Sequence, residues 1–334
     1  MIGPGSRTKG GIAKVILYYQ STAFWKDEDV KWIETYCTGS SKEKIWTFFS
    51  ALISFLGALR GAKIAHIHFT GRTSANRKYV FYLLSKVFRL KIISHIHAPN
   101  LDDLTAIATF SFRRMIRGSD RVISLSPLWS KALAVLVDRD YVVLSNPAGR
   151  FTSTEILKEK IILFAGKLED RKGYLDLIEA FARISNKHGY TLVLAGDGEV
   201  ERARELIADR HMRDATATGW LKPTEMMDLF GRAGIFVLPS YGEGFPVSII
   251  DAMSSNCAVI TTPVGGIPDL LTDLDTCLFI QPGDIQALST ALAVLTADEV
   301  QRRAIASNGH ALALRNFDKD KITGKLAKIY SDLL

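Results

Sequence analysis

The 334-residue sequence contains only three cysteines, Cys37, Cys257 and Cys277, and they lie far apart. Three scattered thiols cannot supply the paired framework of a disulfide-rich protein or the cluster of a structural zinc site. The first residues lack the basic and apolar regions of a secretory signal peptide. The longest apolar run, residues 45–59, contains serines and a threonine and is short for a membrane span. We expect this run to form a buried or half-buried helix.

Patterns of several other protein classes are also missing. There is no repeat of solenoid period and no low-complexity tract, so a repeat array is not expected. The segment GPGSRTKGG lacks the G-x-G-x-x-G spacing of a dinucleotide-binding loop. The two D-x-D sequences, at residues 273–275 and 318–320, do not follow the end of an apolar strand. We interpret both as chance matches to a metal-binding motif.

Two histidine pairs, His66 with His68 and His95 with His97, each place two rings on one face of an expected strand. A metal site there would need further ligands, and no nearby cysteine or acidic set completes one. We therefore predict no metal, and for His66 and His95 we favour packing within the sheet.

The net charge of +7 is unevenly distributed. Residues 1–150 contain 22 Lys+Arg against 10 Asp+Glu, a balance of +12, and residues 151–334 contain 20 against 25, a balance of −5. A basic first half suggests an anionic partner such as a membrane surface, a phosphorylated substrate or nucleic acid. Residues 110–121 mix aromatic residues with arginines, as interfacial helices do, although a solvated helix with an apolar inner side has the same pattern. No aromatic platform or known motif accompanies the charge, so nucleic acid is not expected.

Short apolar segments alternate with helical patterns along the chain. The segments expected as strands are residues 62–69, 90–97, 120–126, 141–146, 160–166, 190–196, 234–240 and 257–262, and residues 174–189 are an example of a helix between them. Near-continuous apolar strands separated by helices indicate parallel sheets covered on both faces. The alternation restarts after residues 145–154, which we interpret as a linker. The predicted fold class is α/β, with two doubly wound Rossmann-like domains that face each other across a ligand cleft.

Glycines and lysines follow the expected strands. Gly10 and Gly11 precede a helix that is expected to begin near Ile12; paired glycines let a backbone approach a ligand, and a helix N-terminus favours an anion. Lys167 and Lys172 flank a short loop before another helix, where two flexible cations could clamp a diphosphate. The glycine pair could equally form a simple turn, and the two lysines could equally be solvent-exposed charges without a ligand.

The stretch SYGEGFPVSIIDAM, residues 240–253, contains two acids that a buried helix does not need. Pro246 suits the first position of a helix, and the N–H groups there would be available to a phosphate or sugar oxygen. Glu243 lies in the preceding turn and Asp251 lies inside the helix. The two carboxylates could accept hydrogen bonds from the hydroxyl groups of two sugars on either side of a diphosphate. A nucleotide sugar has two such sugars, the hexose and the ribose.

Taken together, these segments resemble the family 4 glycosyltransferases of the two-domain GT-B type. FAGKLEDRKGYLDLIEAF resembles the family's G-R-L-x-x-x-K-G segment, and GEGFPVSIIDAM resembles its E-x7-E motif. TTPVGGIPDLL, VLSNPAG, ATGWL and TKGGIAKV match smaller signatures. The set covers nearly the whole chain in order, most strongly residues 145–282. Two positions depart from the pattern: Lys167 stands where an arginine is usual, and Asp251 replaces the second glutamate.

The resemblance implies roles for three catalytic residues. His97 would lie near the transferred sugar, Glu243 would bind hydroxyls of the donor hexose, and Lys172 would hold the diphosphate. Because a lysine lacks the planar fork of arginine, the departure at Lys167 could weaken the second diphosphate contact.

The resemblance also implies a set of donor-binding residues. Gly11 would offer its N–H to the distal phosphate, Asp251 would take the ribose, and the backbone near Leu221 would contact the base. The implied set is Gly10, Gly11, Lys167, Leu221, Gly244, Phe245, Pro246, Val247 and Asp251.

The function implied is retaining transfer of a hexosyl unit from a UDP- or GDP-sugar to a glycan or lipid-linked acceptor, in surface polysaccharide biosynthesis. The resemblance implies no metal and no other cofactor, and the leaving phosphate would itself deprotonate the acceptor. One alternative is a catalytically inactive nucleotide-sugar-binding subunit, against which the retained His97, Lys172 and Glu243 argue. The other is a GT-B nucleotide-sugar epimerase, against which the E-x7-D motif and the K-x4-K pair argue.

The resemblance further implies a layout of the chain. Residues 1–148 would form an acceptor-binding domain, residues 149–315 a nucleotide-sugar-binding domain, and residues 316–334 a helix that crosses back to the first domain. We expect a cytoplasmic protein, with peripheral attachment to the inner face of the plasma membrane through the basic first domain as the alternative.

Overall fold

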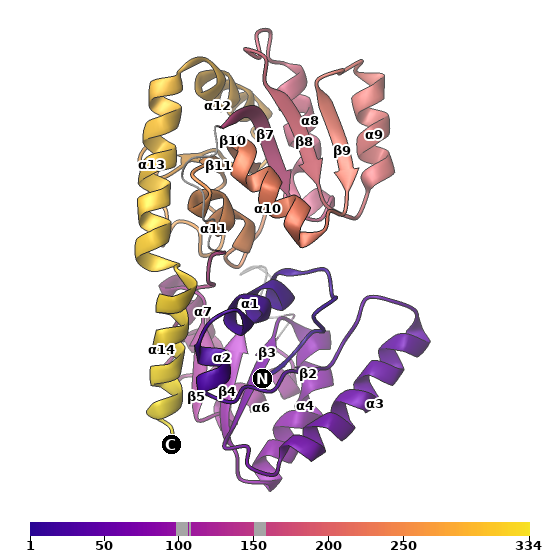
Figure 1. The fold of residues 1–334 in the computed structure, drawn as a ribbon, viewed down its shortest axis with the longest axis vertical. Coiled ribbons are helices and arrows are strands. Elements are labelled where there is room, and N and C mark those ends of the chain that lie inside the picture. Colours follow the sequence, from indigo (N-terminus) through magenta and orange to yellow (C-terminus); the bar gives the residue numbers. More distant parts are fainter. Residues whose placement is uncertain (98–105, 107, 150–157) are drawn as a thin grey trace. The chain divides into compact units, whose positions relative to one another are not determined.

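A computed structural model describes residues 1–97, 106, 108–149 and 158–334 (Figure 1). The chain divides into two compact units. Unit 1 comprises Met1–Pro147, Glu243–Val247 and Lys319–Leu334, and unit 2 comprises Ala148–Gly242 and Ser248–Asp318. Of the predicted linker at 145–154, residues 150–154 lie outside the described part of the chain.

Unit 1 is built on a parallel sheet with the strand order β2-β1-β3-β4-β5-β6. The strands are β1 (Ile2–Gly3), β2 (Ile33–Glu34), β3 (Ile64–Phe69), β4 (Lys91–Ile96), β5 (Arg121–Ser124) and β6 (Val142–Val143). The helices described are α1 (Gly11–Gln20), α2 (Phe24–Asp27), α3 (Ser41–Ala58), α4 (Arg72–Val87), α6 (Phe110–Gly118), α7 (Pro127–Leu136) and α14 (Lys319–Ser331).

Alternation along the strands of unit 1 creates two apolar cores, one on each face of the sheet. Ile92 and Ile96 of β4 join a core that contains residues of α3, α4, α6 and α7. Ile93, which points to the other face, joins a core with residues of α1, α2 and α14. Each helix therefore covers a defined face of the sheet, and α3, α4, α6 and α7 share one of them.

Unit 2 contains a second parallel sheet, with the order β12-β11-β10-β7-β8-β9. The strands are β7 (Glu159–Ala165), β8 (Thr191–Ala195), β9 (Ala215–Gly219), β10 (Ala233–Leu238), β11 (Ala258–Thr261) and β12 (Leu278–Phe279). The helices described are η1 (Asp170–Lys172), α8 (Tyr174–Ala182), α9 (Val200–Asp209), α10 (Pro223–Arg232), α11 (Val247–Ser254), α12 (Ile285–Ala297) and α13 (Glu299–Asn316). Every residue of the central strand β10 is buried, as expected of a sheet covered on both faces.

The α/β fold class with two doubly wound sheets is confirmed. Each of the eight expected strand segments overlaps a strand, and four of them, at β4, β7, β8 and β11, agree with it to within one residue at both ends. The helix expected at 174–189 is shorter than predicted, because α8 ends at Ala182. His188 and Gly189 have positive φ angles of 49° and 79°, and this left-handed turn cannot continue a helix. Across the described residues, no helix is long and apolar enough to cross a bilayer.

Candidate functional site

The glycine loop of unit 1 leads directly into α1. Gly10 precedes the helix with an extended backbone, no side chain caps the first turn, and no acidic residue lies in it. A Cβ added at Gly10 would meet nothing within 4 Å, and one at Gly11 would only touch Val247 Cγ2 at 4.0 Å. The fold itself therefore does not require glycine here. The open space lies where a helix N-terminus attracts an anion.

Segment Glu243–Val247 belongs to unit 1 and is fixed there by two side chains. The Trp129 indole N–H donates to Gly244 O at 3.2 Å, and Asn146 Nδ2 donates to Phe245 O at 2.8 Å. Glu243 is itself buried. Pro246 comes one residue before the first residue of α11, close to the predicted first helical position. Sequence reasoning did not identify Trp129 or Asn146, although Asn146 lies in the quoted VLSNPAG segment.

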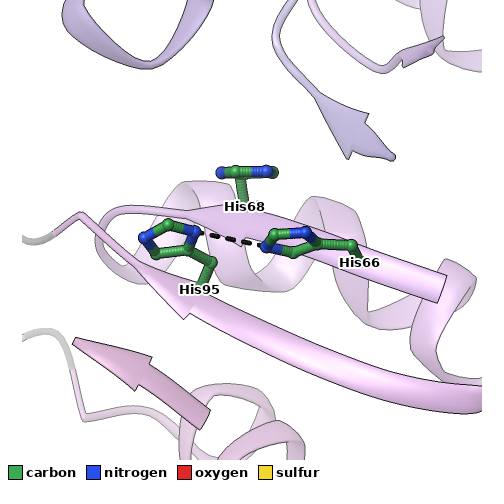
Figure 2. A group of neighbouring side chains, drawn as sticks. All are labelled: His66, His68 and His95. Atoms are coloured by element: carbon green, nitrogen blue, oxygen red, sulfur yellow. Dashed lines mark hydrogen bonds between the residues drawn. The ribbon is translucent and has the colours of Figure 1, made fainter. Parts of the chain in front are cut away.

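His97 follows β4 and belongs to a buried group of four histidines. Its Nε2 shares a hydrogen bond with His68 Nδ1 at 3.0 Å, and its ring stacks on that of His95 with centroids 4.2 Å apart. His66 Nε2 and His95 Nδ1 lie 3.2 Å apart, and Figure 2 shows these two rings pointing toward each other with His68 beside them. The second nitrogen of His66 contacts the Tyr330 hydroxyl of α14 at 2.9 Å. His66 and His95 are buried in the sheet, as predicted.

Burial determines the charge state of this histidine cluster. It lowers the pKa of all four rings, and for His97 burial and the nearby Lys78 lower the pKa to about 3. Lys78 is buried too, and burial lowers the pKa of its amine to about 7. At neutral pH the histidines are therefore uncharged, and each can donate one hydrogen bond and accept another.

Three of these rings, those of His66, His68 and His95, lie close enough to be considered as metal ligands, with one nitrogen of each within 4.8 Å of the others. However, the His66 and His68 rings stack at 4.3 Å with an interplanar angle of 21°. A metal must lie near the plane of each imidazole at about 2 Å from its nitrogen, and two nearly parallel stacked planes do not share such a point. The arrangement fits a hydrogen-bonded stack better than a metal centre, and the absence of a metal stays a prediction.

In unit 2, the loop between β7 and α8 contains the two predicted lysines. Lys167 Nζ lies 2.8 Å from Glu169 Oε2, and Arg171 contacts the other oxygen of Glu169 at 2.8 Å. The hydrogen bond and charge of Glu169 raise the pKa of Lys167, so this lysine stays protonated. Lys172 ends the short helix η1 and is half-buried.

Arg171, which the sequence interpretation did not single out, joins this loop to the loop after β10. Its guanidinium donates to Gly242 O, and its own carbonyl accepts from the Tyr241 N–H at 2.8 Å. Gly173 follows with a left-handed φ of 67°, and a Cβ there would lie 2.1 Å from Pro239 O. The backbone around Lys172 is thus fixed against the carboxyl end of β10.

Asp251 and Leu221 also belong to unit 2. Asp251 lies on α11 with no exposed surface, and its Oδ1 accepts from the Gly149 N–H at 3.1 Å. Leu221 is half-buried between β9 and α10. The predicted residues therefore divide between the two units. Gly10, Gly11 and Glu243–Val247 belong to unit 1 with His97, and the two lysines, Leu221 and Asp251 belong to unit 2.

Comparison with known proteins points to one family. Residues 147–311 match the family described as "Glycosyl transferases group 1". Through this segment, the chain is similar to the group 1 glycosyltransferases. The match includes the lysine loop, Leu221, Glu243 and Asp251, so most of the residues chosen by resemblance lie in the segment that defines the family.

Two curated relatives of this segment illustrate the range of the family. Glycogen synthase of Mycobacterium tuberculosis is 30% identical over 177 residues, which cover 51% of this chain and 42% of the relative. N,N'-diacetylbacillosaminyl-diphospho-undecaprenol alpha-1,3-N-acetylgalactosaminyltransferase of Campylobacter jejuni is 25% identical over 178 residues, covering 53% and 46%. The matched part of the chain spans about half the length of these curated relatives.

A solved structure extends the similarity to the whole chain. HepE of Anabaena, in complex with UDP and glucose, aligns with a TM-score of 0.77 at 17% identity, covering 99% of this chain and 98% of HepE. At this identity the alignment defines the fold, and the GT-B fold predicted by resemblance is confirmed.

Proposed function

We propose that this protein is a retaining glycosyltransferase that moves a hexosyl unit from a UDP- or GDP-sugar to a glycan or lipid-linked acceptor in polysaccharide biosynthesis. The observation that carries the proposal is the position of the lysine loop. Lys167 and Lys172 lie at the carboxyl end of β7, inside the segment that matches the family. Ligands of doubly wound sheets bind at that end of the strands.

The charges of the two groups suit a nucleotide diphosphate sugar. In unit 2, Lys172 and the protonated Lys167 would bind the diphosphate, and Asp251 would accept a hydrogen bond from the ribose. In unit 1, the uncapped N-terminus of α1 would receive a phosphate, and Glu243 would accept hydrogen bonds from the hexose. UDP as the nucleotide is favoured by its presence in the HepE complex.

The proposed reaction passes through an oxocarbenium-like transition state as the nucleotide diphosphate leaves. Negative charge then grows on the leaving phosphate, and cations or helix N-termini that already point at it give the main stabilisation. Lys172 and the first turn of α1 would fulfil this role. The leaving phosphate would take the proton of the acceptor hydroxyl on the same face of the sugar, which preserves the anomeric configuration.

His97 would act as a neutral group in this scheme. Because its pKa is lowered to about 3 by burial and by Lys78, it would bind a sugar hydroxyl as a hydrogen-bond donor or acceptor and would not supply positive charge. Its bond to His68 would fix which nitrogen carries the proton.

The acceptor class is proposed from the relatives. The name of the Campylobacter jejuni relative describes transfer to a sugar on diphospho-undecaprenol, and that of a Staphylococcus aureus relative describes capsular polysaccharide biosynthesis. A lipid-linked glycan acceptor follows the first of these names, and an acceptor on an anionic membrane suits the basic first half of this chain.

The test is a transfer assay with UDP-glucose, UDP-N-acetylglucosamine and GDP-mannose, in which nucleotide release is measured and the product anomer is read by NMR. We expect release with one donor, an α-linked product from the α-linked donor, and unchanged turnover in EDTA. Lys172→Ala should abolish turnover. Lys160→Ala is the matched control and should behave as wild type, because Lys160 lies at the amino end of β7, away from the lysine loop.

The same assay separates the alternatives. An inverted product would contradict the retaining mechanism. A donor that binds without turnover in the presence of a range of acceptors would indicate an inactive binding subunit. Conversion of the donor to an epimer without lasting nucleotide release would indicate an epimerase.

A further inference from the structure

Helix α3 of unit 1 has two different apolar faces. One face packs inward: Phe55 and Ala51 are buried, and the Phe55 ring contacts Phe81 of α4 at 5.5 Å between centroids in an edge-on arrangement. The other face is exposed. Trp46 has 76% and Ile53 has 73% of its surface exposed, which is uncommon for such large side chains within one helix.

The exposed apolar side chains of α3 form one continuous stripe. Its members are Ile45, Trp46, Phe49, Ile53 and Leu56. At 3.6 residues per turn, these positions fall within an arc of about 100°. A stripe that extends over three turns is a continuous apolar surface rather than a scatter of single exposed residues. An aromatic residue such as Trp46 favours the boundary between water and an apolar phase.

Positive charge predominates in the part of the sequence that contains the stripe. Residues 41–91 contain one acid, Glu43, whose carboxylate is used in the capping box with Ser40. The same stretch contains ten lysines and arginines; Lys78 is buried, and the exposed ones are Lys42, Arg60, Lys63, Arg72, Lys86, Arg89 and Lys91. Lys42 and Arg60 lie before and after the stripe, in line with its centre by helical spacing, and both are exposed.

The neighbouring helices on the same face of the sheet add to this surface. α4 ends with exposed Val87 and Phe88, and α6 begins with exposed Phe110, whose ring contacts Tyr79 of α4 at 6.2 Å. α3, α4 and α6 belong to one core on one side of the unit 1 sheet, and Figure 1 shows α3 along the outside of unit 1. Apolar and cationic side chains thus occur together on this layer of helices.

We propose that this layer, with the α3 stripe at its centre, binds the surface of an anionic lipid bilayer. Trp46, Phe49 and Ile53 would enter the boundary between headgroups and acyl chains, with α3 lying parallel to the surface. The surrounding lysines and arginines would contact lipid phosphates. An apolar stripe flanked by cations is the pattern of helices that lie in a membrane interface, and cations next to an anionic leaflet strengthen such binding.

A second copy of the chain is a poorer occupant of the stripe. A twofold dimer would place the same patch of both copies together. That arrangement would bring the exposed Lys42 and Arg60 of both copies close together, and like charges at short range repel. An anionic lipid surface neutralises the same charges.

The experiment measures co-sedimentation of the full chain with vesicles of phosphatidylcholine alone or of equal parts phosphatidylcholine and phosphatidylglycerol. We expect binding to the anionic vesicles, much weaker binding to the neutral ones, and loss of binding at high salt. Trp46→Ser with Ile53→Ser should weaken binding at least about tenfold. Lys42→Glu with Arg60→Glu should weaken it about 25-fold or more, since each cation contributes about fivefold.

Matched controls keep the outcome clear. Val300→Ser with Leu314→Ser removes two exposed apolar groups from α13 of unit 2, and Lys325→Glu with Lys328→Glu makes the same charge change on α14. Both controls should bind as wild type, and circular dichroism melting should be the same for all variants. Trp46→Phe should retain binding but lose the blue shift of tryptophan emission.

Three results would overturn the proposal. They are no binding to the anionic vesicles, equal binding to both kinds of vesicle, and wild-type binding by the stripe variants. Sedimentation velocity without lipid provides a further check, because a dimer that is lost in Trp46→Ser with Ile53→Ser would show that the stripe is an interface between copies. None of these results depends on transferase activity.

Discussion

Lowering the pH from about 7.5 to about 5.5 should destabilise unit 1 through its four buried histidines. Burial holds the pKa of His66, His68, His95 and His97 below the ordinary value, so the folded protein does not bind protons there. An unfolded histidine has a pKa of about 6.5 and does bind a proton in this range. The unfolded state therefore binds more protons, and stability is lost as the pH falls below about 6.5.

The size of the loss follows from the unfolded state alone. At pH 5.5 an unfolded histidine is about 90% protonated, which favours unfolding by about 1.4 kcal/mol for each ring that stays neutral when folded. Four rings give about 5–6 kcal/mol. Lys78 adds a little under 1 kcal/mol in the same direction, because its folded pKa of about 7 lies below the unfolded value of about 10.5. A domain of ordinary stability, about 5–15 kcal/mol, would lose a large part of it.

The assay is urea unfolding at the two pH values, followed by tryptophan fluorescence. Four of the five tryptophans lie in unit 1, so the signal reports mainly on the unit that contains the cluster. His68→Leu should reduce the pH-dependent loss by about one quarter, since one of four groups is removed. His188→Asn, at an exposed position in unit 2, should not change it. Equal stability at both pH values would refute the reasoning, because it would mean that the folded rings bind protons as readily as unfolded ones.

Three substitutions test other parts of the structure. Lys78→Met should raise the free energy of unfolding at neutral pH by about 1–3 kcal/mol, because it removes a buried amine that is costly to charge; a lower urea midpoint would contradict this. Gly173→Ala should lower the stability of unit 2 by about 2–4 kcal/mol, because it combines a left-handed alanine with a clash at Pro239 O; an unchanged melting temperature would show that the loop can move. Glu169→Gln should tighten nucleoside diphosphate binding about two- to fivefold in calorimetry, because it releases Lys167 from an exposed ion pair; weaker binding would mean that Glu169 positions the lysine.

Much of the fold was predictable because its strands are long and apolar. β7 and β10 appear in the sequence as continuous apolar runs, and the sequence located β7 to within one residue and β10 to within two. β1, β2 and β12 have only two residues each, which is too few for any periodicity. β9, with the sequence ATATG, combines small residues and threonine and has little apolar contrast with a turn.

The site was only partly predictable for a similar reason. Motifs identify residues such as Lys172 because their spacing along the chain is fixed. The contacts that hold the Glu243–Val247 segment join Trp129 to Gly244 and Asn146 to Phe245, across 115 and 99 residues, and a single sequence contains no sign of such pairing.

The helix at residues 45–59 shows a further limit of sequence patterns. An apolar run indicates a preference for leaving water, but it does not say which side chains are covered. Phe55 is buried as expected, whereas Trp46 in the same helix is mostly exposed. The exposed stripe became visible only when the positions of the neighbouring helices were known.

Calorimetric titration of the purified chain with UDP, GDP, ADP and their common sugar conjugates tests the central claim most directly. Wild type and Lys160→Ala should bind one conjugate tightly, and the variant that combines Lys172→Ala with Glu243→Ala should not bind it. The donor would then be known, and the acceptor search would turn to the corresponding glycan pathway. Failure of every conjugate to bind wild type, or equal binding by the double variant, would contradict the assignment of this site to a nucleotide-sugar donor.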